Sequence, residues 1–351
     1  MAVRLAVAGA GLIGARHAAR IAACPATELA AIVDPGPAGA EIADRYGVAS
    51  YASLAELFAA RPPDGVVLAT PNRLHVDGGL ECVAAGVPVL VEKPIGDTVA
   101  GAARLVEAAE AAGVPVLTGH HRTHSPILAA ARGIVASGVL GRIVAVVGTA
   151  LLCKPEDYFD VGDGWRRAPG GGPILINLIH EVNALQQLVG DVVRVQATTS
   201  QAVRGFPVED TAAMVFTFAC GALGTFLLSD TAASQRSWEL TSREDPAYPS
   251  HADEDCYHLA GTTGSLSIPT MRLSTYRGSA SWWEPLVTST VAAERTDPLG
   301  RQIAHFAAVI RGEASPLCSG RDGLAALRVV EAVVESARTG RPVEPGAGPA
   351  G

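Results

Sequence analysis

Hydrophobic positions along the chain follow one rhythm up to about residue 120. Short apolar runs alternate with segments whose apolar residues recur every three or four positions. The runs predict buried strands and the recurring pattern predicts amphipathic helices. We expect strands at 3–8, 28–34, 65–70, 87–92 and 114–119, and helices at 12–24, 38–46, 75–85 and 98–112. This alternation predicts a doubly wound parallel sheet covered by helices on both faces.

The rhythm changes after about residue 123. A helix is expected at 125–137 and another at 173–189, and extended segments occupy 142–152, 192–203, 211–219 and 222–232. Strands that follow strands predict a second, α+β domain on an open, mostly antiparallel sheet. The stretch 243–300 predicts loops around short strands, and helices at 300–311 and 320–338 close the chain.

Two domains suit a chain of 351 residues. We place the first at 1–122 and the second at 123–351, with the last helices free to pack back on the first domain and a tail at 344–351. The composition is that of a globular protein, with 48% hydrophobic and 18% charged residues.

Charge and cysteine usage narrow the class of protein. The net charge is −8 and neither sign gathers into a long run, which argues against nucleic acid and anionic membranes as partners. No apolar stretch is long enough to span a bilayer, and the N-terminus lacks the features of a signal peptide. Six cysteines without a CxxC pair indicate reduced thiols. We expect a cytoplasmic protein without a metal site.

A glycine-rich turn follows the first expected strand and opens the first expected helix. Gly9, Gly11 and Gly14 match G-x-G-x-x-G, with Leu12 and Ile13 between the last two glycines. In this setting the glycines permit a tight turn, approach of a pyrophosphate and close helix packing, while the helix N-terminus offers unpaired N–H groups. We predict a dinucleotide-binding Rossmann domain.

Asp34 ends the second expected strand, where a carboxylate accepts hydrogen bonds from the adenosine ribose hydroxyls. The carboxylate would repel a 2′-phosphate, and the following residues 35–40 include no arginine. We therefore expect NAD as the preferred cofactor, with NADP as the alternative.

Three further polar clusters end expected strands, at 70–75 (TPNRLH), 92–94 (EKP) and 119–126 (GHHRTHSP). With the glycine turn, the triple glycine before the helix that carries His180, and the closing helix, their order resembles the glucose-fructose oxidoreductase, inositol dehydrogenase and rhizopine-catabolism (Gfo/Idh/MocA) family. The resemblance covers nearly the whole chain. It implies a Rossmann domain, an α+β domain whose sheet often forms an oligomer interface, and a substrate held in the cleft between the two.

The family resemblance implies an oxidoreductase acting on sugars, cyclitols and related polyols, assembled as a homodimer or homotetramer. Lys93 matches the lysine of the family's EKP motif and His180 its helical histidine. Loss of hydride from a carbinol also releases a proton, so histidine suits the role of base, and a lysine suits stabilisation of the alkoxide. Hydride transfer of this kind needs no metal.

The spacing of apolar and polar residues predicts two different faces for the helix that contains His180. An apolar stripe follows Leu178, Val182 and Leu185, whereas His180 and Asn177 fall on another face. The preceding glycines fit a packed loop, and the helix N-terminus offers N–H groups to a substrate oxygen. Relatives commonly carry aspartate where Ile176 stands, four residues before the histidine, and many also carry one at the position of Asn183. Asn177 is therefore expected to bond either the imidazole or the substrate.

The remaining candidate residues divide between the cofactor and the substrate. Cofactor contacts are expected at Thr70, Asn72, His75, Glu92 and Lys93. Substrate contacts are expected at His121, Arg122, Trp165, Arg166, Asn177 and His180. Helix caps and solvated loops are the alternative interpretation of several of these.

Arg166 would suit a carboxylate, so an acidic polyol stands beside a neutral sugar as a candidate substrate. The sequence leaves two further alternatives open. One is a regulator that binds dinucleotide without turnover, because the same fold carries such proteins. The other is an enzyme whose tightly held cofactor cycles between two substrates. The cluster His251, Cys256 and His258 contains metal-capable atoms but predicts a solvated loop.

Overall fold

The computed structural model describes residues 1–160 and 164–346, and the end of the predicted tail, 347–351, lies outside these residues. The chain divides into two compact units. The first contains Met1–His124 and Pro298–Leu327, and the second contains Ser125–Asp297 and the chain from Arg328 on. The boundary predicted from the sequence lies between residues 122 and 123, with the last helices free to pack back on the first domain.

The first unit is built on a six-stranded sheet in which every strand pair is parallel. The strand order is β3-β2-β1-β4-β5-β6, the order of a dinucleotide-binding Rossmann fold. The fold class predicted for this part of the chain is confirmed. The strands are β1 (Val3–Ala8), β2 (Thr27–Val33), β3 (Ala49–Tyr51), β4 (Gly65–Leu68), β5 (Val89–Val91) and β6 (Val116–Thr118).

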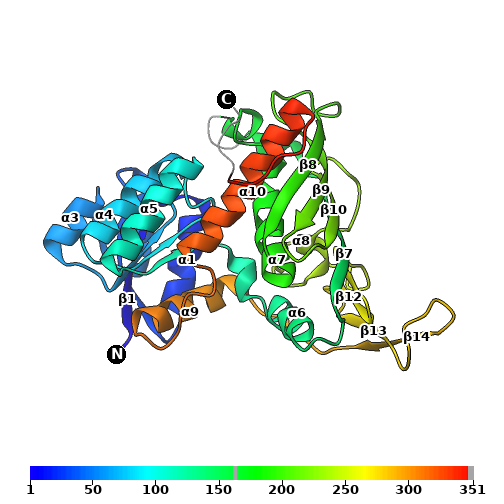
Figure 1. Cartoon of the computed structure of the whole chain (residues 1–351). Helices are drawn as coiled ribbons and strands as arrows, with labels where there is room; N and C mark the ends of the chain where they lie inside the picture. Colours follow the sequence, from blue (N-terminus) through cyan, green and yellow to red (C-terminus); the bar gives the residue numbers. More distant parts are fainter. Residues whose placement is uncertain (161–163, 347–351) are drawn as a thin grey trace. The chain divides into compact units, whose positions relative to one another are not determined.

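Helices cover this sheet in two groups (Figure 1). α3, α4 and α5 pack side by side, and α1 packs against α2 and α9. The helices are α1 (Leu12–Ala23), α2 (Pro37–Tyr46), α3 (Leu54–Ala60), α4 (His75–Ala84), α5 (Val99–Ala112) and α9 (Pro298–Ile310). β3 and α3 are not predicted from the sequence, because three strand residues and a two-turn helix are too short to show a period.

α9 reaches the first unit from far along the sequence and completes its core. Its residues Ile303 and Phe306 are fully buried in one cluster with Leu5, Ile21 and Leu90 of the Rossmann elements. The cluster joins five strands of the sheet to α1, α2 and α9, so burial of apolar side chains holds α9 in place.

The second unit is built on an eight-stranded open sheet with the order β14-β13-β12-β11-β7-β10-β9-β8. All neighbours pair antiparallel except β10 and β7, which are parallel. This confirms the mostly antiparallel sheet that the sequence predicts. The strands are β7 (Ile143–Leu151), β8 (Val192–Ser200), β9 (Thr211–Phe218), β10 (Leu223–Ser229), β11 (Tyr257–Gly261), β12 (Gly264–Ile268), β13 (Arg272–Tyr276) and β14 (Leu286–Thr290).

Helices α6 and α7 pack against each other in the second unit (Figure 1). The helix expected at 173–189 begins as a π-helix at Ile174–Leu178 and continues as α7 (Ile179–Val189). The last helix, α10 (Gly320–Thr339), starts in the first unit and ends in the second, where Ser336 Oγ accepts a hydrogen bond from the backbone of Ala197 in β8. The remaining helices are α6 (Pro126–Ala136) and α8 (Trp238–Thr241).

The packing of α9 predicts a large stability effect at Phe306. Substitution Phe306→Ala removes a fully buried ring, which costs about 3–5 kcal/mol through lost burial and the cavity left behind. Urea denaturation of the first unit should show this loss. Leu317→Ala is the control, because Leu317 is 43% exposed, and it should change the free energy of unfolding by less than about 1 kcal/mol. Equal effects of the two substitutions would contradict the assignment of α9 to this core.

Candidate active site

The turn between β1 and α1 requires glycine at two positions for reasons of space. Gly9 has φ +98°, and a Cβ there would lie 2.5 Å from the carbonyl oxygen of Ala69. A Cβ at Gly14 would lie 1.9 Å from the carbonyl oxygen of Gly9. Both distances are far inside van der Waals contact, so these two glycines let the chain turn tightly against the end of β4.

Gly11 has a different environment, because a Cβ added there would meet no atom within 4 Å. Gly11 is the N-cap of α1, and no side chain caps this helix. The next residue, Leu12, is 78% exposed. Folding alone therefore does not demand the middle glycine, and the open space lies at N–H groups that favour an anion. These residues fit the pyrophosphate of a dinucleotide.

Asp34 follows β2 directly and lies beside this turn. Its Oδ2 accepts a hydrogen bond from the backbone N–H of Ala10 at 2.8 Å, and its Oδ1 accepts one from Gly36 at 2.7 Å. The carboxylate is half-buried, and each oxygen keeps a further lone pair. This arrangement fits a ribose diol.

Glu92, at the end of β5, makes a buried contact with α1. Its Oε1 lies 2.7 Å from Nε2 of His17, and the histidine is completely buried. Burial by itself raises the pKa of Glu92, but the hydrogen bond and charge of His17, together with Lys93 and His121, lower the pKa to about 2. Glu92 therefore joins the glycine-turn helix to the EKP loop. Glu92 is one of the predicted cofactor contacts, whereas the sequence pattern gives no signal for His17.

His75 links two loops at the same edge of the sheet. Its Nδ1 lies 2.7 Å from the carbonyl oxygen of Pro94, and its Nε2 lies 2.8 Å from that of Thr70. The side chain is 1% exposed, so it contacts protein backbone on both sides. The hydroxyl Oγ1 of Thr70 is buried and has no hydrogen-bond partner within the described part of the chain. This hydroxyl is the atom at which a bound cofactor would add a partner.

Lys93 is half-buried between these groups. Burial, followed by the positive charge of Lys93, lowers the pKa of the neighbouring His120 to about 3, so His120 is neutral at physiological pH. His121 is half-buried, and Arg122 is buried in the short helix His121–His124. The sequence analysis named His121 and Arg122 but passed over His120. A ring kept neutral beside a lysine is typical of functional sites.

His180 lies in the second unit and is only 7% exposed. Val182 and Leu185 of the predicted apolar stripe are buried and Asn177 on the other face is half-buried, but Glu181 and Asn183 are buried as well. Tyr257 donates a hydrogen bond to Glu181, a residue that the sequence analysis did not single out.

The triple glycine before this helix makes room for backbone and for a carboxylate. A Cβ at Gly171 would lie 2.2 Å from the carbonyl oxygen of Trp165, and one at Gly172 would lie 2.3 Å from Oε1 of Glu209. That oxygen accepts the backbone N–H of Ile174 at 2.9 Å. Burial raises the pKa of Glu209, and the hydrogen bond from Ile174 opposes the rise. One N–H group of the helix N-terminus, that of Ile174, is therefore taken by Glu209.

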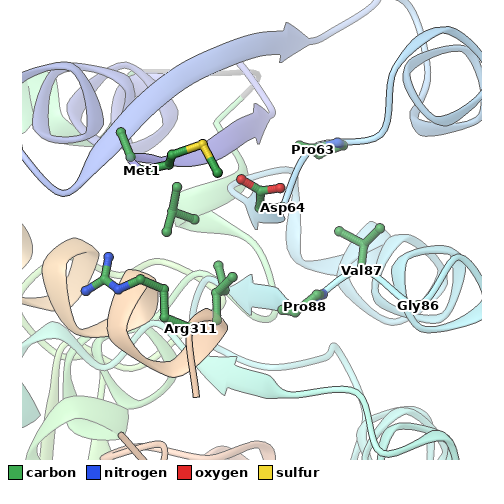
Figure 2. Close-up of a pocket in the computed structure, with 10 residues that line it drawn as sticks. Met1, Pro63, Asp64, Gly86, Val87, Pro88 and Arg311 are labelled. Carbon is green, nitrogen blue, oxygen red and sulfur yellow. The ribbon is translucent and has the colours of Figure 1, made fainter. Parts of the chain in front are cut away.

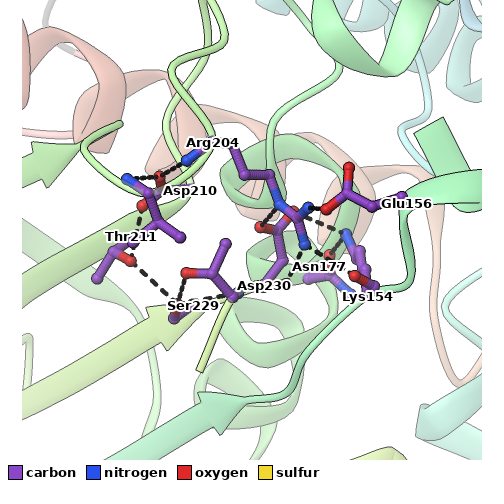
Figure 3. Close-up of polar contacts among 10 residues, drawn as sticks. Lys154, Glu156, Asn177, Arg204, Asp210, Thr211, Ser229 and Asp230 are labelled. Carbon is purple, nitrogen blue, oxygen red and sulfur yellow. Dashed lines mark hydrogen bonds and ion pairs between the residues drawn. The ribbon is translucent and has the colours of Figure 1, made fainter. Parts of the chain in front are cut away.

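Asn177 belongs to a polar cluster that the sequence analysis did not foresee (Figure 3). Lys154 Nζ donates to its Oδ1 at 2.7 Å and lies 3.5 Å from Oδ2 of Asp230. Arg204 Nε lies 3.1 Å from the other oxygen of Asp230. The pattern of the sequence alone does not bring these residues together, because Asn177 lies in a helical segment and its partners lie in separate loops and at a strand end.

The side chain of Arg166 contacts Tyr158, eight residues earlier in the chain. Its guanidinium donates to the carbonyl oxygen of Tyr158 and stacks 3.9 Å above the centre of the Tyr158 ring. Trp165 beside it is 45% exposed. Trp165 and Arg166 thus lie in the loop that precedes the helix of His180.

A surface depression of about 530 Å³ lies at the amino ends of the strands of the Rossmann sheet (Figure 2). Its lining residues come from the starts of β1, β4 and β5 and from the end of α9, and include Asp64 and Arg311. Ligands of parallel sheets bind at the carboxyl ends of the strands, so this depression has no part in the candidate site.

Two kinds of feature are absent from the described residues. Within 1–160 and 164–346, no helix has the length and hydropathy needed to cross a membrane. The same stretches contain no group of three or more histidine, cysteine, aspartate or glutamate side chains arranged to hold a metal ion.

Comparisons with known proteins agree with this geometry. Residues 3–120 match the model of an oxidoreductase family described as an NAD-binding Rossmann fold, named GFO_IDH_MocA, and residues 128–267 match the C-terminal domain of that family. The rhizopine catabolism protein MocA of Rhizobium meliloti is 31% identical over 58% of this chain and 64% of its own length. The 1,5-anhydro-D-fructose reductase of Ensifer adhaerens is 29% identical over 95% of this chain and 97% of its own.

One solved structure shows the same fold over its whole length. The WlbA dehydrogenase from Bordetella pertussis, in complex with NADH and UDP-GlcNAcA, superposes with a TM-score of 0.79 at 24% identity. The match covers 98% of this chain and 99% of that one.

The contrast between the glycines predicts two different mutant phenotypes. Gly11→Ala places a methyl group in open space, so the melting temperature should stay within about 2 °C while NAD affinity falls by about tenfold or more. Gly14→Ala forces a backbone shift and should lower both stability and affinity. Calorimetric NAD titrations and thermal melts separate the two. Unchanged NAD affinity in Gly11→Ala would remove the pyrophosphate assignment.

The pair of His17 and Glu92 predicts a pH effect on stability. The folded pKa of Glu92, about 2, lies below its ordinary value of 4.5, so the unfolded chain binds the extra proton first as pH falls. The contribution of Glu92 is therefore complete above about pH 4.5 and is lost as pH drops toward 2. Melting temperature should fall less steeply between pH 5 and 3 in Glu92→Gln than in the wild type. The exposed control Glu41→Gln should keep the wild-type slope.

Proposed function

This chain belongs to the Gfo/Idh/MocA oxidoreductase family, and we propose that it is a dehydrogenase or ketoreductase acting on a secondary hydroxyl. The substrate class is a sugar, a cyclitol or a related polyhydroxy acid. The full-length similarity to a 1,5-anhydro-D-fructose reductase supports this class. The observation that carries the proposal is the open turn at Gly11 on the sheet edge that also presents Lys93.

The residues present fit a nicotinamide dinucleotide. Gly11 leaves space for the pyrophosphate, Asp34 offers its carboxylate to the ribose, and the buried hydroxyl of Thr70 has no hydrogen-bond partner among the described residues. When bound, NAD supplies the hydride acceptor and NADH the hydride donor. Asp34 favours NAD over NADP, because its charge opposes a 2′-phosphate. A higher kcat/KM with NADPH than with NADH would overturn this preference.

Lys93 is proposed to stabilise the developing alkoxide and His180 to exchange the proton of the reacting hydroxyl. Lys93 keeps its position through its neighbours, since Glu92 is fixed by His17 and Pro94 by His75. A lysine charge close to the reacting oxygen lowers the free energy of the oxyanion. Histidine gains or loses a proton near neutral pH, as the reaction requires in either direction.

We further propose that Asn72, His121, Arg122, Trp165 and Arg166 contribute to binding, and that the enzyme is a cytosolic homo-oligomer. The outer face of the second sheet supports assembly. Val147, Val215, Leu223 and Leu227 are 40–56% exposed on three neighbouring strands, which form an apolar surface suited to a second copy. The scattered cysteines suit a reducing compartment.

Turnover tests the proposed reaction. Purified protein is assayed at 340 nm with NAD or NADP and a panel of myo-inositol, D-xylose, D-glucose and D-glucuronate, and with NADH or NADPH and 1,5-anhydro-D-fructose. Lys93→Ala and His180→Ala should each lower kcat by at least about a hundredfold, the scale of a lost acid–base or oxyanion group, while NAD affinity of His180→Ala stays unchanged. Tight NAD binding without turnover of any panel member would favour a dinucleotide-sensing regulator instead.

A further inference from the structure

The contact with Lys154 determines the orientation of the Asn177 carboxamide. The lysine is 8% exposed, and its Nζ lies 2.7 Å from the terminal Oδ1 of Asn177. An ammonium group has three donors and no acceptor, so the atom that it contacts at this distance must be the amide oxygen. The orientation of the carboxamide therefore follows from the chemistry of the pair, and the NH₂ end points away from Lys154. Asn177 itself is half-buried.

The surrounding cluster holds Lys154 in this position (Figure 3). Its backbone N–H donates to the carbonyl oxygen of Asp230 at 2.9 Å, and its carbonyl oxygen accepts from Nη2 of Arg204 at 2.9 Å. Asp230 lies 3.5 Å from the ammonium, which also sits 4.8 Å from the centre of the Tyr158 ring. Arg204 in turn bonds Asp230 and Glu156. Backbone and side chain of Lys154 are thus both fixed, although burial of an ammonium costs free energy.

We propose that Lys154 is a positioning residue that sets the polarity of Asn177, and that Asn177 donates its NH₂ group to an oxygen of the substrate. This inference rests on the proposed function. Asn177 stands three positions before His180, so the two side chains occupy adjacent turns of one helical segment. The subsite takes a hydroxyl, carbonyl or carboxylate oxygen next to the reacting carbon. It disfavours an ammonium group, because two donors would face each other.

Asn177 offers the substrate different hydrogen-bonding groups from those that a carboxylate would offer. A carboxylate in this segment would present acceptors only, whereas Asn177 held by Lys154 presents donors. With its Oδ1 engaged by Lys154, Asn177 offers its NH₂ group for substrate recognition. The pair confers specificity without placing a further charge beside the substrate.

The orientation is tested without any enzymatic activity. In protein labelled with ¹⁵N-asparagine, the Asn177 NH₂ signals are assigned by their loss in Asn177→Ala. Lys154→Met should shift and broaden these signals, while Lys154→Arg, which keeps donors only, should leave them close to wild type. Asp230 stays paired with Arg204 in both variants, so the methionine leaves no unpaired carboxylate, and thermal melts verify folding. Unchanged Asn177 signals in folded Lys154→Met would overturn the positioning role.

Kinetics test the contact with substrate, using the panel member that gives the highest kcat/KM. Asn177→Ala should raise KM about five- to tenfold, the effect of one lost hydrogen bond, with kcat changed by less than about threefold. Lys154→Met should do the same and Lys154→Arg should restore KM. The double variant should be no worse than Asn177→Ala alone, since Lys154 acts through Asn177. Additive effects would contradict the proposal.

Different experimental outcomes would contradict the proposed function and this inference. If no panel member is turned over, the proposed reaction fails, and the same compounds are titrated into labelled protein while the Asn177 NH₂ signals are observed. A shift with an oxygen-bearing probe, absent in Lys154→Met, supports the subsite. Absence of any shift, with the Lys154 effect intact, would overturn substrate recognition by Asn177 and leave only the internal contact.

Discussion

The buried contact between His17 and Glu92 is the interaction on which the first unit's site depends. His17 projects from the helix that begins at the glycine turn, and Glu92 begins the loop that carries Lys93. One short hydrogen bond at 2.7 Å therefore fixes the distance between the dinucleotide turn and the proposed catalytic lysine. A buried carboxylate is costly unless it is paired, so the contact cannot be loosened without a large penalty. His75 adds a second link by joining Thr70 and Pro94.

Local patterns in the sequence were sufficient to predict most of the fold. Apolar runs separated by helical spacing indicated the Rossmann strands, and Gly9, Gly11 and Gly14 were informative because strand, turn and helix follow one another. The short elements β3 and α3 escaped detection, since neither is long enough to show a period. The burial of His180 was also not predictable, because spacing describes one helix and not what packs around it.

Side-chain partners far apart in the sequence account for what sequence reasoning missed in the site. His17 and Glu92 are separated by 75 positions, and Glu181 and Tyr257 by 76. Motifs identify the residue type at a strand end, but they do not say which atom that residue contacts. Lys154 shows the limit clearly, because a lysine after a strand is ordinarily a surface residue. Only its burial against Asn177 gives it a role.

The parallel pair of β7 and β10 determines how the second sheet must assemble. Strands β8 to β10 form one antiparallel meander and β11 to β14 another, and each can form from neighbouring segments of the chain. β7 alone joins them, with β10 on one side and β11 on the other. β7 can therefore pair only with strands that lie more than 70 residues further along the chain. Closing such long loops is slow, so the insertion of β7 is expected to set the folding rate of this unit.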